Sequence, residues 1–458
     1  MKRLNRRKFL QYGTSSLIAA SPLMTLLGSL QKLEAAQTTG EYKALVCILL
    51  EGGADVFNMV VPTQPEAYAS YQKVRKQLAV PQEALLPIKH ANKNEANNLS
   101  YGFRSNMQAM QNLFENKNLA ILANVGTLVS PLSLADIKNG ATLPPQLFAH
   151  NTQRDLWMRG DGRGYQKSGW VGRASDLFYP TPNPYFNVTV ADSNILQEGG
   201  QAEAISFSEP SVSPDTMTYY GFGPESGGSD LGKVYQRLYE QKAKDSNKLM
   251  AAGAQKRLFK LNQQEILQNL FDGVKTFEGF SDGVHETGKP LGKQLELVAQ
   301  ILSVRDNFPN KPKRQIFFVN HHGWDTHDSD NAHQAEYLSE SLEAFYNALK
   351  EMGIENQVTT FTISDFGRSL SPNGAGTDHG WGAHAFVMGG AVKGGDIYGK
   401  MPILAPDSPD AWEDRMIPTT AIEQYYAVLM RWFGATEAET AALFPNLKAF
   451  GTPLPDFL

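Results

Sequence analysis

The stretch KRQIFFVNHHGWDTH, residues 313–327, decides the fold class of this chain. It begins with a strand pattern whose centre, IFFV, is β-branched and aromatic, as expected of a buried strand. A helical pattern follows at 333–352, and a second strand pattern, QVTTFTIS, follows at 357–364. This strand–helix–strand order predicts a parallel βαβ unit, and therefore an α/β fold with a mostly parallel sheet.

Similar patterns extend the prediction to the rest of the chain. In 333–352, apolar residues recur every three or four positions along one helix face, and Gly353 is a natural stop. Further strands are expected at 42–50, 118–125, 186–191 and 385–389, and further helices at 231–271 (with a break near 251–253), 291–306 and 419–433.

Polar residues gather where the predicted strands end. Open α/β sheets bind ligands outside the carboxyl ends of their strands. The first such end, after the strand at 42–50, is Gly52–Gly53–Ala54–Asp55, in which the glycines permit a tight turn and Asp55 offers a carboxylate. Taken alone, Asp55 is better interpreted as a solvated turn residue.

The second strand end is the loop HHGWDTH at 321–327. It holds three of the nine histidines of the chain and Asp325. Neutral imidazole and carboxylate are the usual ligands of zinc and similar cations, so Asp325 and His327 are candidate metal ligands. The alternative is a polar loop whose histidines form only local hydrogen bonds.

The third strand end begins at Ser364–Asp365–Phe366–Gly367–Arg368 and continues to DHGWGAH at 378–384. Asp365 is a further candidate ligand, and Arg368 could hold an anionic group bidentately. Of His379 and His384, one could bind metal while the other acts beside it or in proton transfer. Together the three strand ends predict a site for two metal ions.

The first residues form an export-signal pattern. Residues 1–8 carry five basic residues and no acid, and NRRKFLQ at 5–11 resembles the twin-arginine consensus. A modestly apolar stretch at 17–30, too short and polar to span a membrane, precedes Ala35–Ala36. An ordinary amphipathic helix would not explain this order. We therefore expect a twin-arginine signal at 1–36, handling by the twin-arginine translocase, and a periplasmic or otherwise exported protein.

Charge and cysteine content narrow the class of protein. Residues 1–36 hold six of the 42 Lys and Arg and one of the 47 Asp and Glu, so their removal takes the net charge from −5 to −10. Such a chain is a poor binder of nucleic acid or anionic membrane, and it has no run for a stable membrane anchor. Cys47 is the single cysteine, so no internal disulfide forms, and its apolar run predicts burial.

Residues 37–458 are long enough for two domains or for one large domain with an insertion. The region at 160–230 is rich in Gly, Pro, Ser and Tyr and has few periodic patterns. We therefore expect one α/β domain at 37–458 with an inserted subregion at about 160–310. Its aromatic residues, with Trp157 in the approach, could bind a sugar, although such residues more often form local core.

Several motifs resemble one exported bacterial family, known as domain of unknown function 1501. These motifs are GGADxxNxVVP at 52–62, GWDTH at 323–327, DFGR at 365–368 and DHGWGxH…GGxVxGG at 378–395. The family is related to the alkaline phosphatase and sulfatase superfamily. The resemblance implies an alkaline-phosphatase-like three-layer sandwich around a mostly parallel sheet, and hydrolysis of phosphate or sulfate esters with two metal ions.

Position by position, the resemblance implies metal ligands at five places. They are Asp55, Asp325, His327, Asp365 and His379. Two departures follow.

The first departure is Phe366, which stands where the phosphatases usually carry histidine, so one metal site lacks a ligand unless His322 or His384 replaces it. The second is the nucleophile: in the matching stretch at 147–153, Thr152 could serve, or could simply cap a helix.

The sequence thus predicts an exported metal-dependent hydrolase of phosphate or sulfate esters, with zinc the favoured divalent ion and a small anionic ester as substrate. Thr152, Arg368 and His384 are the candidate catalytic residues, and a water activated by the metal could replace Thr152. The alternative is a non-catalytic exported binding or assembly protein that keeps the fold. Phe366 and the uncertain nucleophile favour that alternative.

Overall fold

The computed structural model describes residues 40–91, 98–179, 181, 183–207, 230–255, 257–258, 270, 274–281, 289–309, 311–451 and 455–458. The predicted export signal at 1–36 lies outside these residues, as does part of the helical tract predicted at 231–271. Within the described part of that tract, α8 (Asp230–Lys242) ends early, and residues 248–255 are helical again, so the break lies at 243–247 and the predicted break near 251–253 is wrong.

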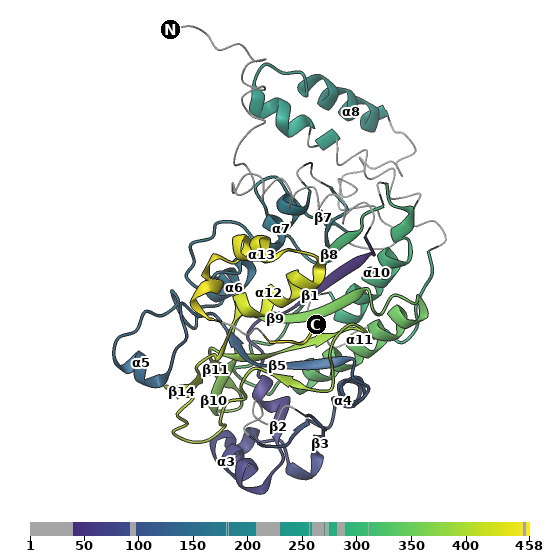
Figure 1. Cartoon of the computed structure of the whole chain (residues 1–458). Helices are drawn as coiled ribbons and strands as arrows, with labels where there is room; N and C mark the ends of the chain where they lie inside the picture. Colours follow the sequence, from purple (N-terminus) through teal and green to yellow (C-terminus); the bar gives the residue numbers. More distant parts are fainter. Residues whose placement is uncertain are drawn as a thin grey trace, which may run out of the picture.

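A nine-stranded sheet forms the centre of the molecule (Figure 1). Only β12 runs antiparallel to its neighbours, and the other pairings in this sheet are parallel. The predicted α/β class with a mostly parallel sheet is therefore confirmed. In spatial order the strands are β13 (Ile397–Tyr398), β5 (Leu119–Gly126), β12 (Ala383–Met388), β9 (Val358–Ser364), β1 (Lys43–Leu50), β8 (Arg314–His321), β6 (Asn187–Thr189) and β7 (Ile205–Ser206), with β16 (Thr420–Ala421) also pairing with β5.

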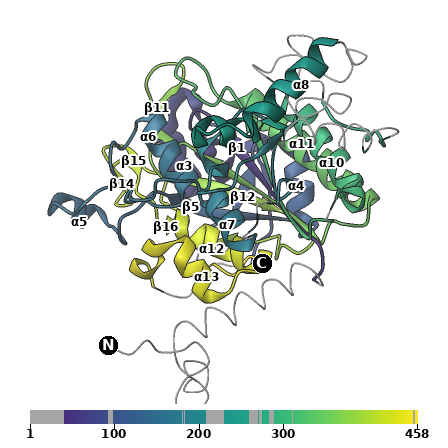
Figure 2. The ribbon, with the colours of Figure 1, turned by 90° about the horizontal axis from the view of Figure 1, so that it is seen from above.

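Both faces of the sheet are buried, which makes the fold a three-layer sandwich. Successive side chains of a strand point to opposite faces, and in β1 Val46 and Ile48 join one hydrophobic core while Leu45 and Cys47 join another. The first core is completed by α4 (Gln108–Glu115), α10 (Leu291–Ser303) and α11 (Ala332–Glu351), and the second by α6 (His150–Arg159), α7 (Trp170–Phe178), α12 (Ile422–Phe433) and α13 (Glu437–Leu443). Figure 2 shows α12 and α13 on one side of the sheet and α10 and α11 on another.

The predicted elements are confirmed with small shifts at their ends. The six expected strands correspond to β1, β5, β6, β8, β9 and β12, and the helices at 291–306, 333–352 and 419–433 correspond to α10, α11 and α12. Cys47 is buried and free, as predicted. Trp157 and Trp170 lie in the second core, so these two aromatic side chains are packed inside the protein.

The region 160–310, predicted as an inserted subregion, contributes strands to the central sheet and a helix that covers it. It supplies the edge strands β6 and β7 and the covering helix α10. Smaller pieces lie outside the central sheet: α3 (Pro65–Arg75), α5 (Leu134–Lys138), the sheet of β2 (Val60–Pro62), β4 (Tyr101–Phe103) and β3 (Leu86–Pro87), the hairpin of β10 (Arg368–Pro372) and β11 (Thr377–His379), and the pair β14 (Ala411–Trp412) and β15 (Arg415–Met416). Among the described residues, no helix combines the length and apolarity needed to cross a bilayer.

The topology brings the predicted strand ends to one edge. Strands β9, β1 and β8 are neighbours and run in the same direction, so the loops that follow them emerge side by side. Because β12 runs the opposite way, the segment before it reaches that same edge. The residues after β1, β8 and β9 and those before β12 therefore surround one site.

Candidate metal centre

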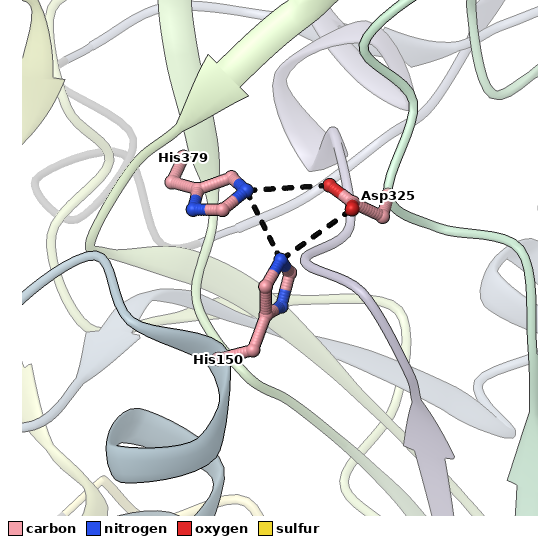
Figure 3. A group of neighbouring side chains, drawn as sticks. All are labelled: His150, Asp325 and His379. Carbon is pink, nitrogen blue, oxygen red and sulfur yellow. Dashed lines mark hydrogen bonds and ion pairs between the residues drawn. The ribbon is translucent and has the colours of Figure 1, made fainter.

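Three side chains from distant parts of the chain point toward one another at this edge (Figure 3). His150 is the first residue of α6, Asp325 lies in the loop after β8, and His379 ends β11. Their ligand atoms all lie within 4.8 Å of one another. The Nε2 atoms of His150 and His379 are 3.0 Å apart, and the Asp325 carboxylate lies 3.4 Å from His379 Nε2 and 3.5 Å from His150 Nε2.

His327 adds a fourth group to this cluster. Its Nε2 atom lies 3.0 Å from the nearer carboxylate oxygen of Asp325 and 3.0 Å from His379 Nε2. The cluster of His150, Asp325 and His379, with His327 beside two of its members, offers imidazole nitrogens and a carboxylate, which is a donor set that suits zinc and related divalent ions.

The outer nitrogens of two histidines are held by oxygen atoms. His150 Nδ1 lies 2.7 Å from Asp365 Oδ2, and His379 Nδ1 lies 2.7 Å from the carbonyl oxygen of Phe148. An ionised carboxylate and a carbonyl only accept hydrogen bonds, so each Nδ1 must carry the proton. In the neutral imidazole the Nε2 atom then presents a lone pair, as in metal-binding histidines whose other nitrogen is fixed by a hydrogen bond.

This arrangement fits a bound cation. Two Nε2 lone pairs that face each other at 3.0 Å repel unless a proton or a cation lies between them. Phe148 adopts a left-handed backbone conformation, with φ of 71°, while it presents its carbonyl to His379. Such conformations are unfavourable for a bulky residue and concentrate at functional sites.

The protonation states at the centre also suit a cation. Burial raises the pKa of Asp325, but the hydrogen bond and charge of Arg368, with His150 and His327, outweigh burial and lower it, so the carboxylate is ionised. Burial lowers the pKa of His379, aided by the charges of His150 and Arg368 and opposed by Phe148 and Asp325. A neutral imidazole and an ionised carboxylate are the forms that bind metal.

Arg368 is a structural partner of the centre rather than an open anion site. Its side chain is fully buried, and it donates to Asp325 Oδ1 at 2.8 Å and to the carbonyl of Gly52 at 3.2 Å. Its remaining nitrogens donate to the hydroxyl and carbonyl of Thr377. With four of its five N–H donors used and its side chain buried, Arg368 holds Asp325 and the turn after β1 in place.

Asp55 and Asp365, two of the five expected ligands, are engaged outside the cluster. Asp365 is buried and holds His150 from behind, with Arg154 Nε 3.6 Å from its other oxygen. Asp55 forms a buried ion pair with Arg75. The structure therefore brings Asp325, His327 and His379 together, with Asp365 behind them and Asp55 in a separate pair.

Thr152 and His384 point elsewhere. Thr152 follows His150 by two residues, about 200° around the helix, and its hydroxyl donates to Gln146. His384 is buried, accepts the backbone N–H of Asn124 through Nδ1 at 3.1 Å, and packs against Phe57. Burial lowers the pKa of His384 to about 3.

A second polar group adjoins the centre through α6. Arg154 lies one turn after His150, on the same helix face, and forms an ion pair with Glu51. Glu51 also contacts His322 Nδ1 at 2.8 Å and accepts from Asn320 at 2.6 Å. Burial raises the pKa of Glu51, but Asn320, Arg154 and His322 together lower it.

His150 is the member of the cluster that the sequence patterns missed as a ligand. It lies in the stretch 147–153, which was considered for a nucleophile and not for a metal ligand. Its position at a helix start offers no spacing signal, because its partners lie more than 170 residues later. A histidine within a stretch already matched to the active centre was the available hint.

The comparisons agree with the expected family. Residues 309–440 match the family described as Protein of unknown function (DUF1501). The match spans β8, β9 and β12 and includes Asp325, His327 and His379, whereas His150 lies before it. The resemblance predicted from the motifs at 323–327, 365–368 and 378–395 is thereby confirmed. No curated protein matches the chain.

Several solved structures resemble the fold at low identity. The Ps i-CgsB structure is 11% identical, with 90% of this chain and 77% of that chain covered and a TM-score of 0.36. The PsFucS1 sulfatase from Pseudoalteromonas sp. is 11% identical, with coverages of 92% and 73% and a TM-score of 0.29. The C-terminal periplasmic domain of EcEptC from Escherichia coli, in complex with Zn, is 9% identical, with coverages of 92% and 93% and a TM-score of 0.33. Likeness at this level carries no argument about the reaction.

Proposed function

We propose that the protein is an exported metal-dependent hydrolase of small phosphate or sulfate esters. The convergence of His150, Asp325 and His379, with His327 beside Asp325 and His379, is the observation that supports this proposal. These four residues would hold a divalent ion, zinc being favoured by the imidazole-rich donor set. When bound, such an ion polarises an ester oxygen and makes a neighbouring water more acidic.

The residues around the cluster have complementary tasks in this proposal. Asp365 and the Phe148 carbonyl orient the imidazoles, and Arg368 orients Asp325. Arg154, one quarter exposed beside His150, is the guanidinium placed to steady an anionic ester. Water is the attacking group, because the Thr152 hydroxyl lies on another face of α6.

Metal analysis followed by an ester panel tests the proposal. Natively exported protein is expected to contain a divalent ion and to hydrolyse aryl phosphate or aryl sulfate esters. Asp325→Asn is expected to lose both the ion and the turnover, whereas Asp328→Asn in the same loop is the matched control. Fully metal-loaded protein that turns over no ester would contradict the proposal.

A non-catalytic exported binding or assembly protein is the second candidate function. The position of the Thr152 hydroxyl and the apolar ring of Phe366 beside the imidazoles favour it. Metal-free wild-type protein whose stability is unchanged by Asp325→Ala would support this candidate over the hydrolase.

Export through the twin-arginine translocase is part of the proposal and rests on residues 5–11. Replacing Arg6 and Arg7 with lysine is expected to leave the folded protein in the cytoplasm. Cell fractionation and immunoblotting measure this, with a Lys2→Arg variant as control. Unchanged export of the double variant would contradict this route.

A further inference from the structure

We infer that the centre takes a single metal ion, and that the buried guanidinium of Arg75 supplies the positive charge at Asp55 that a second ion would supply. The inference rests on the proposed metal centre but concerns the number of ions and the residues that set it. The three strand ends predicted a site for two ions. The inference replaces this prediction with a site for one ion.

Asp55 is committed to Arg75. The Asp55 side chain is 3% exposed, and its Oδ2 atom forms an ion pair with Arg75 Nη2. Asp55 directly follows the turn after β1, so its position at the sheet edge is as expected while its partner is not. A negative charge at this depth needs a cation, and the guanidinium supplies one at Oδ2, whereas the buried Oδ1 has no hydrogen-bond partner among the described residues.

Arg75 is held so that it cannot easily leave. It is fully buried at the end of α3, and its Nε donates to Asn58 Oδ1 at 2.9 Å. Its Nη1 donates to the carbonyls of Ser369 and Leu370 at 3.0 Å each. An ion that took its place at Asp55 would leave a buried guanidinium without a counter-charge, which is strongly unfavourable.

Phe366 occupies a second position at which a further metal ion could otherwise bind. It directly follows Asp365, and its ring centroid lies 4.7 Å from those of both His150 and His379. It is 1% exposed, and a Cβ on Gly53 would stand 2.5 Å from its ring. An apolar ring therefore fills the space beside the imidazoles, and it offers no lone pair to an ion.

The two histidines that could have replaced a ligand at position 366 are engaged elsewhere. His322 contacts Glu51, and His384 accepts a backbone hydrogen bond inside the core. Two further carboxylates near this edge are also engaged: Glu51 is paired with Arg154, and Asp378 lies 3.4 Å from His327 Nδ1 and accepts from Asn373 at 2.7 Å. Among the described residues, the cluster that contains His150, Asp325 and His379 is the one group of metal-ligating side chains.

Ion stoichiometry tests the inference directly. Zinc is measured per chain by elemental analysis of the purified full-length exported protein, and by calorimetric titration of chelator-treated protein with zinc alone. One ion per chain is expected. The double variant Asp55→Asn/Arg75→Met removes the ion pair without leaving a lone charge, and it too is expected to bind one ion.

The outcomes separate this inference from the proposed hydrolase. One ion in both proteins supports it, and loss of an ion in the double variant, or two ions in the wild type, overturns it while leaving the hydrolase intact. No ion overturns both. One ion without ester turnover supports the single-ion centre and contradicts only the hydrolase. If the double variant fails to fold, the wild-type stoichiometry still decides.

Discussion

At the residue scale, His150 and His379 each use one ring nitrogen for the protein and leave the other for the centre. Asp365 holds His150 with a charge, whereas a neutral carbonyl holds His379. A carboxylate behind an imidazole increases its basicity and therefore its strength as a ligand. The orientation of the cluster thus depends on residues that do not themselves face the ion.

Replacing Asp365 tests this dependence. Asp365→Asn keeps a hydrogen-bond acceptor but removes the charge, and is expected to weaken zinc binding about 10- to 100-fold. Competition with a chelator of known affinity measures it. Asp155→Asn is the control, because Asp155 is half exposed and pairs only with Arg159 on the outside of α6. Equal affinity in both variants would contradict the assigned role of Asp365.

At the element scale, α6 carries two functions on one face. His150 begins the helix and Arg154 follows after one turn, so the helix presents an imidazole and a guanidinium to the same edge of the sheet. Helix α6, which lies outside the parallel βαβ unit, thus adds both side chains to the centre.

Arg154→Ala is expected to lower kcat/KM for an anionic ester about 10- to 100-fold, because a hydrogen bond to a charged group contributes about 1.5–3 kcal/mol. Arg154→Lys should restore part of this loss, and metal content should be measured first. Arg159→Ala is the control, since Arg159 bonds the carbonyls of Gln166 and Lys167 instead. Unchanged kinetics for Arg154→Ala would remove it from the substrate site.

The turn after β1 requires a glycine at position 53, because the neighbouring Phe366 ring leaves no room for a side chain. Gly53 adopts φ of 89°, and an added Cβ would meet the buried ring of Phe366. Residues other than glycine rarely adopt this backbone conformation. The buried Phe366 ring also has no free space into which it could move to avoid the added Cβ.

Gly53→Ala is therefore expected to destabilise the protein by about 2–4 kcal/mol and to weaken zinc binding through Phe366. Gly353→Ala separates strain from crowding, because Gly353 has φ of 66° and open space around it. It should cost only about 1 kcal/mol. Thermal and denaturant unfolding measure both, and equal losses would argue against crowding by Phe366.

At the scale of the whole molecule, one buried acid links stability to pH. Glu423 in α12 is fully buried and accepts from the backbone N–H of Gly162 at 2.8 Å and from Asn446 at 3.1 Å. Burial raises its pKa to about 7, with the charge of Asp161 adding to the shift and the hydrogen bonds opposing it. The folded protein therefore keeps this proton after the unfolded chain has lost it.

Because of this difference in pKa, Glu423 stabilises the folded protein at low pH and less so as the pH rises. The stabilising contribution of protonated Glu423 is complete below pH 4.5, the ordinary pKa, and is lost as pH rises to about 7. Glu423→Gln, which cannot ionise, is expected to gain stability relative to wild type over this interval, on the order of 3 kcal/mol. Urea unfolding of both proteins at pH 4.5, 6 and 8 measures it, with exposed Glu437→Gln as control. A constant difference across pH would refute the assignment.

Much of the fold could be predicted because the deciding interactions are local or periodic. The apolar cores of β1, β8 and β9 and the spacing of three and four in α11 appear in the sequence itself. Parallel neighbours then place their following loops at one edge, so Asp325 and His327 could be assigned to a shared site before any coordinates.

The partners of each side chain were decided only in the tertiary structure. His150 becomes a member of the centre because α6 packs across the carboxyl edge of the sheet, and Asp55 leaves it because α3 brings Arg75 to its carboxylate. Sequence alone determined which elements form and which residue types reach the edge. Whether a carboxylate there meets a metal ion or a guanidinium depends on contacts between residues far apart in the chain, which no local pattern encodes.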